Sequence, residues 1–108
     1  MRDSRFERSA RTKEQRFAAN AILGIHRVKL RETIKTADLL IKLTRIHPQR
    51  YKELDTDNLA RSLKAIRDGV ADAIAVDDND KRLTWDYAQL QHPKEFGVWI
   101  EIFRRSRA

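Results

Sequence analysis

The apolar residues between Asp57 and Ile74 recur at the spacing of one face of an α-helix. They are Leu59, Leu63, Ile66, Val70 and Ile74. Steps of three and four residues place these side chains on one stripe, which must pack against other apolar groups. Asp57 is expected to cap the helix, because its carboxylate can accept hydrogen bonds from the free amides of the first turn. The sequence therefore predicts a core-packed helix over 57–74, although Gly69 weakens it locally.

Alternation of apolar and polar residues predicts three β-strands, at residues 37–47, 82–90 and 96–103. Pro48 stops the first strand, because proline cannot continue a strand's hydrogen-bond ladder. His92-Pro93 provides a turn between the other two strands. We therefore expect these two to pair as a C-terminal antiparallel hairpin.

A second helix is predicted from about Thr12 to Arg31. Its apolar stripe is formed by Phe17, Ala21, Ile25 and Val28, and Gly24 interrupts it. Two helices and three strands in 108 residues predict a single α+β domain, with a small mixed sheet packed against two helices. Residues 1–11 are expected to form a flexible basic segment ahead of this domain.

The positive charge lies in the first half of the chain. Residues 1–50 hold 13 Lys or Arg against 5 Asp or Glu, whereas residues 51–108 hold 10 against 11. A net charge of +7 favours a polyanionic partner such as DNA. The cations expected to contact DNA phosphates are Arg11, Lys13, Arg16, Arg50 and Lys52. A solvated basic tail is the alternative for the first ten residues.

Composition excludes several other classes of protein. The absence of cysteine excludes disulfides, thiolate zinc sites and cysteine nucleophiles. The histidines are scattered without zinc-like spacing, and no glycine-rich phosphate loop is present. The apolar runs are too short to cross a bilayer, and no signal-peptide pattern occurs. We therefore expect no membrane association and a cytoplasmic location.

Four aspartates gather at two element boundaries of this basic chain. Asp55 and Asp57 flank the start of the predicted helix, and Asp77-Asp78 lies in the turn after it. Carboxylates two positions apart on an extended segment point the same way, and oxygen ligands suit Mg²⁺ or Mn²⁺. The simpler alternative is that one Asp caps the helix and the pair only stabilises a turn. Carboxylates repel phosphates, and a divalent cation bound between them would remove this repulsion.

Three short motifs occur in a fixed order: Asp55-Thr-Asp57-Asn58-Leu59, Lys64-Ala-Ile-Arg-Asp68-Gly-Val and Val76-Asp77-Asp78. Together they resemble the RusA family of phage and prophage Holliday junction resolvases. The resemblance covers residues 39–102. It implies a RusA-like fold and a magnesium-dependent, homodimeric endonuclease that resolves four-way DNA junctions by paired symmetric nicks.

The resemblance also assigns roles to individual residues. Asp55, Asp57 and Asp78 would bind the metal, with Asp77 beside them, and a basic residue on the helix would assist catalysis. Counting from the first motif selects Arg61, whereas the spacing to the later aspartate selects Lys64. The family's proline- and asparagine-rich N-terminal strand is replaced here by a basic helix. Two alternatives remain, a non-catalytic DNA-binding protein and a less selective metal-dependent nuclease.

Overall fold

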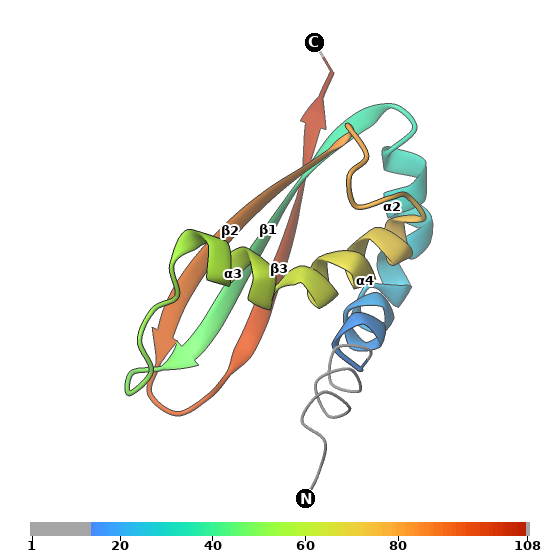
Figure 1. The fold of residues 1–108 in the computed structure, drawn as a ribbon. Helices are drawn as coiled ribbons and strands as arrows, with labels where there is room; N and C mark the ends of the chain where they lie inside the picture. The colour runs from blue at the N-terminus through green and yellow to red at the C-terminus, as the bar shows by residue number, and fades with distance from the viewer. Residues whose placement is uncertain (1–13, 108) are drawn as a thin grey trace, which may run out of the picture.

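The computed structural model describes residues 14–107 and contains three strands and several short helices (Figure 1). Residues 14–22 are helical. The elements that follow are η1 (Gly24–His26), α2 (Arg27–Thr33), β1 (Ala37–Pro48), α3 (Thr56–Ser62), α4 (Lys64–Ile74), β2 (Leu83–His92) and β3 (Gly97–Ser106). The predicted flexible segment 1–11 lies outside the described residues. No helix in the described part is long and apolar enough to span a bilayer.

The strands form one mixed sheet in the order β2-β1-β3, which confirms the predicted α+β class. β1 pairs in parallel with β2 and antiparallel with β3. The predicted direct pairing of the last two strands is wrong, because β1 lies between them. β1 carries the fully buried side chains Leu39, Ile41 and Leu43, and the central position buries it best. Residues 93–96 are long enough to cross the roughly 10 Å between the outer strands.

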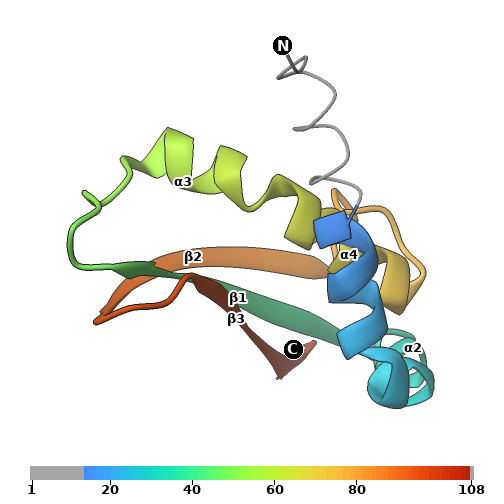
Figure 2. The same cartoon turned by 90° about the horizontal axis from the view of Figure 1, so that it is seen from below.

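Helices cover one face of this sheet, and Figure 2 shows α3 and α4 lying above it. No element within residues 14–107 covers the opposite face, which we call the bare face. The core lies between the two layers. Its fully buried side chains come from β1 and from the apolar stripe of α4, where Val70 and Ile74 are almost completely buried. This stripe is the one that the spacing predicted.

The predicted helix 57–74 is divided into α3 and α4 at Leu63. The backbone of Leu63 (φ −100°, ψ 3°) departs from helical values, and its side chain is buried. The predicted N-cap, Asp57, is wrong by two residues. Asp55 is the N-cap, since its backbone is extended and its carboxylate accepts a hydrogen bond from the Asn58 amide at 2.8 Å. Asp57 instead lies in the first turn of α3.

The N-terminal helical segment packs through a face that periodicity did not identify. Ala19, Leu23 and Ile34 are buried, whereas the predicted stripe (Phe17, Ala21, Ile25 and Val28) is exposed. The physical reason is a close crossing with α4. A β-carbon added at Gly69 would lie 2.2 Å from the Arg16 carbonyl oxygen and 2.8 Å from the β-carbon of Ala19. Small residues therefore decide which face meets the core.

Candidate functional site

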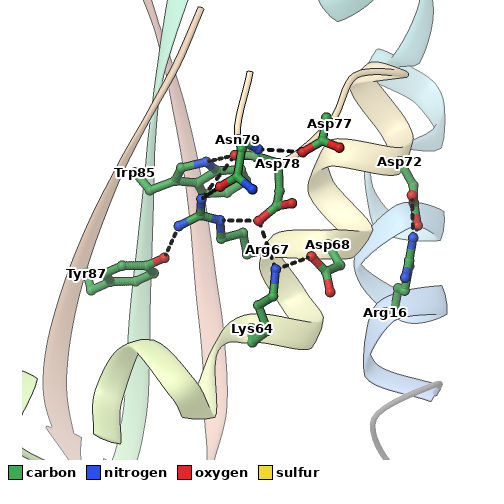
Figure 3. Close-up of polar contacts among 10 residues, drawn as sticks. All are labelled: Arg16, Lys64, Arg67, Asp68, Asp72, Asp77, Asp78, Asn79, Trp85 and Tyr87. Carbon is green, nitrogen blue, oxygen red and sulfur yellow. Dashed lines mark hydrogen bonds and ion pairs between the residues drawn. The ribbon is translucent and has the colours of Figure 1, made fainter. Parts of the chain in front are cut away.

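Lys64, at the start of α4, joins two carboxylates from different parts of the chain (Figure 3). Its ammonium donates to Asp68 Oδ1 at 2.9 Å and to Asp78 Oδ2 at 2.8 Å. Asp68 lies one turn further along α4, and Asp78 lies in the turn that leads to β2. The fold thus brings together Lys64 and Asp78, two residues that sequence analysis placed in one site.

Arg61 was the alternative to Lys64 as the basic residue of the site. It lies in the last turn of α3, and its side chain has no hydrogen-bond or ion-pair partner within residues 14–107. Lys64, by contrast, contacts Asp78 directly. The geometry therefore favours Lys64 as the cation that accompanies this carboxylate.

Arg67 fixes the turn that carries Asp78, and sequence analysis did not identify it. Its Nε donates to Asp78 Oδ2 at 2.9 Å, and its Nη2 donates to the Asp78 carbonyl at 3.0 Å. Its Nη1 donates to the Tyr87 hydroxyl at 2.8 Å. The guanidinium lies over Trp85, whose Nε1 also donates to the Asp78 carbonyl. The turn is therefore held from both the helix and the sheet (Figure 3).

The sequence contains a weak signal for this arrangement. Arg67 follows Lys64 by three positions, so both side chains lie on the same side of α4. Two cations on one side of a helix indicate a nearby anion. The contact with Tyr87 and Trp85, however, depends on how β2 lies against α4, which no local pattern specifies.

The charges of this cluster stabilise each other. The hydrogen bond from Lys64 lowers the pKa of Asp78 below its ordinary value, despite the opposing effect of partial burial, and Arg67 adds to the lowering. The bonds to Asp78 and Asp68 raise the pKa of Lys64. Lys64 is therefore a cation at neutral pH. It can neutralise a phosphate, but it cannot act as a general base in this state.

The other predicted metal ligands lie apart from this cluster or are engaged locally. Asp55 accepts hydrogen bonds from Asn58 at both carboxylate oxygens, at 2.8 and 3.0 Å. Asp77 accepts from the Asn79 amide at 2.8 Å, which is the turn interaction that the alternative interpretation expects. Asp57 is exposed, and its carboxylate has no hydrogen-bond partner among the described residues.

These carboxylates do not converge on a single point in this structure. Within residues 14–107, no group of three or more histidine or acidic side chains is close enough to hold one metal ion. The acidic residues are instead divided between the start of α3 and the turn after α4. The donor chemistry nevertheless fits Mg²⁺, because Asp57 and Asp78 offer carboxylate oxygens at exposed or partly exposed positions.

The predicted DNA-contacting cations have different environments. Arg16 forms a two-bond ion pair with Asp72 at 2.7 and 2.9 Å, so its charge is already balanced. Arg50 lies over the Tyr51 ring, and Lys52 is exposed. Both belong to the connection that leads from β1 to Asp55. Arg11 and Lys13 lie outside the described residues.

Comparison of this chain with protein-family models, with curated proteins and with solved structures finds no match.

Acid should weaken the turn after α4 within a defined pH window. Hydrogen bonds from the side chain and backbone of Arg82 lower the pKa of Asp80 from 3.8 to about 2. A carboxylate whose pKa is lowered by folding stabilises the protein above its unfolded value, and this contribution disappears as the pH falls through 2. Thermal melts between pH 5 and 2 should therefore show a smaller loss of Tm for Asp80→Asn than for the unmodified protein.

The matched control is Asp86→Asn, an exposed aspartate on β2 with no carboxylate hydrogen bond among the described residues. It should follow the unmodified protein across the whole pH range. Identical curves for all three proteins would show that the Asp80–Arg82 pair does not contribute to stability.

Proposed function

We propose that this protein is a divalent-metal-dependent endonuclease that resolves four-way DNA junctions as a homodimer. The observation that carries the proposal is the 2.8 Å contact between Lys64 and Asp78. These residues belong to two of the three motifs that resemble the RusA family, and they lie 14 positions apart in the chain. Their contact places a cation beside a carboxylate, a combination that suits phosphate chemistry.

Each residue has a defined role in this proposal. Asp55, Asp57 and Asp78 would hold Mg²⁺, which supplies an activated water and stabilises negative charge on the phosphate. Asp57 presents an exposed carboxylate on α3. Arg67 positions Asp78 through its carboxylate and its carbonyl oxygen. Lys64 is held beside Asp78 and would neutralise charge on the phosphate that is cut.

The charge of the chain supports a DNA substrate. A net charge of +7 attracts phosphates, whereas the local carboxylates repel them unless a cation intervenes. A four-way junction has approximate two-fold symmetry, so a two-fold dimer would place two equivalent sites on equivalent strands. Paired nicks then follow from the symmetry of the assembly.

A non-catalytic DNA-binding protein is the second candidate. It is favoured by the hydrogen bonds that Asp55 accepts from Asn58 and that Asp77 accepts from Asn79. These local bonds give both aspartates a structural role without a metal ion. In this case the acidic residues only cap a helix and stabilise a turn.

Incubation with a labelled synthetic four-way junction tests the proposal. We expect paired nicks in millimolar Mg²⁺, none in EDTA, and little cutting of a linear duplex of the same sequence. Cutting of duplex and junction at equal rates would instead indicate a less selective nuclease. Junction binding without cutting in either Mg²⁺ or Mn²⁺ would favour the second candidate and contradict the proposed activity.

A further inference from the structure

The helical N-terminal segment, which comprises residues 14–22, η1 and α2, is apolar on two sides. One side is buried and includes Ala19 and Leu23. The other side is exposed, and we call it the apolar ridge. It consists of Phe17, Ala18, Ala21, Ile22, Ile25 and Val28, none of which bears a charge or a polar group. Helices that are apolar on more than one side are normally buried, so the exposed ridge indicates a partner.

A groove of about 860 Å³ lies beside the ridge. One wall comes from the helical segment, with Ile22, Leu23 and Leu30, and the other comes from β3, with Val98, Ile100 and Ile102. Ile22 belongs to both the ridge and the groove. The ridge and the groove are therefore adjacent parts of one surface. A second copy related by a two-fold axis could place its ridge in this groove while its own groove receives the first ridge.

The exposed apolar area approaches that of a standard interface. The large side chains of this surface, which are Phe17, Ile22, Ile25, Val28 and Val98, have exposed fractions between 36% and 89%. They present on the order of 600 Å² together, against about 800 Å² per partner in a standard interface. A typical monomer has no single apolar patch larger than roughly 300–600 Å².

The bare face of the sheet is a poorer candidate. Leu90, Trp99 and Phe103 are exposed there, but a charged row crosses its middle. The strand register aligns Lys42 with Asp86 on one side and with Glu101 on the other. Covering that face would remove three charges from water, which is costly unless each is fully paired. The ridge itself carries no charged side chain.

We propose that the apolar ridge and the adjacent groove form a two-fold interface between two copies of this chain. This inference deepens the proposed function, because it assigns the surface of the homodimer. Lys29 and Arg104 also line the groove, and no acidic residue does so among the described residues. Two copies that each carry a net charge of +7 repel one another. Salt should therefore strengthen this dimer by screening the repulsion, whereas it would weaken binding of an acidic partner.

Light scattering at micromolar concentration, at low and high salt, tests the interface. The full chain should have about twice the monomer mass of 12.7 kDa, with a lower dissociation constant at high salt. Ile25→Lys and Val28→Lys should raise the dissociation constant at least about 100-fold, because each would bury a positive charge in a groove that Lys29 and Arg104 already line. Both positions are exposed in one chain, so neither change should disturb the fold, and thermal melts will verify this.

Leu90→Lys is the matched control, since Leu90 is exposed on the bare face of the sheet. It should remain a dimer. A monomeric unmodified protein, or a dimer that Leu90→Lys dissociates and Ile25→Lys does not, would overturn the interface. The readout does not depend on catalysis. A monomer that still cuts junctions would refute the interface and the homodimer but leave the nuclease activity standing. A ridge-dependent dimer that cuts nothing would support the interface and refute the proposed activity.

Discussion

Replacing Asp78 by asparagine should abolish junction cleavage while junction binding is retained. The change removes one proposed metal-binding carboxylate and the ion pairs that Lys64 and Arg67 make with it. Loss of residues that only support a metal ligand typically costs 10- to 100-fold, so loss of a ligand should lower the cleavage rate by at least about 100-fold. Binding should be unchanged or tighter, because the variant has one negative charge fewer.

Asp57→Asn should have the same effect on cleavage. Its consequences for the fold should be smaller, because Asp55 rather than Asp57 caps α3. Asp86→Asn is the matched control for both variants, as it removes one exposed aspartate from the opposite face of the sheet. Quenched time courses with the labelled junction measure cleavage, and gel shifts in EDTA measure binding. Normal cleavage by both Asp57→Asn and Asp78→Asn would show that these roles are wrong.

Gly69→Ala should destabilise the protein, although the substitution adds only one methyl group. Its new β-carbon would lie 2.2 Å from a backbone oxygen of Arg16, which cannot rotate away. The N-terminal helix and α4 must then move apart, at a cost of about 1–3 kcal/mol that exceeds the gain of up to about 1 kcal/mol from replacing a helical glycine. For a domain of this size, the Tm should fall by roughly 5–15 °C.

Gly24→Ala is the matched control for this prediction. A β-carbon at Gly24 would meet no heavy atom within 4 Å. Its Tm should therefore stay the same or rise slightly, since alanine restricts the unfolded chain more than glycine does. If the two variants melted at the same temperature, the close crossing of the N-terminal helix and α4 would be contradicted.

The spacing of apolar residues predicted helices and strands correctly where the apolar side chains it selects are also the buried ones. The stripe from Leu59 to Ile74 faces the core as its spacing required, and three strands occur close to the expected positions. Strand pairing could not be predicted in the same way. The choice of β1 rather than β3 as the neighbour of β2 depends on which strand is central, and that is a property of the whole sheet.

The N-terminal segment shows a second limit of periodicity. Both of its sides are apolar, so spacing alone could not decide which one meets the core. The decision depends on Gly69, which is distant in sequence and permits a close approach by Ala19. The predicted stripe of Phe17, Ile25 and Val28 remains exposed in one chain, and the proposed dimer gives it a partner.

The candidate site was also predicted only in part. The family resemblance placed Asp78 in one site with either Arg61 or Lys64, and the structure brings Lys64 into contact with Asp78. Arg67 was missed, because its role requires the turn, α4 and β2 to meet. The acidic residues of α3 lie in a separate group, so their part in a common metal site stays a prediction.

Titration of the amide NMR spectrum with Mn²⁺ tests the central claim most directly. A bound paramagnetic ion broadens the signals of nearby amides and leaves distant ones sharp. We predict that substoichiometric Mn²⁺ selectively broadens both acidic segments, residues 55–58 and residues 77–79, and that excess Mg²⁺ reverses the effect by competing for the site. Uniform weak broadening across the chain, or broadening of only one of the two segments, would contradict a shared metal site and with it the proposed catalytic role of Asp57 and Asp78.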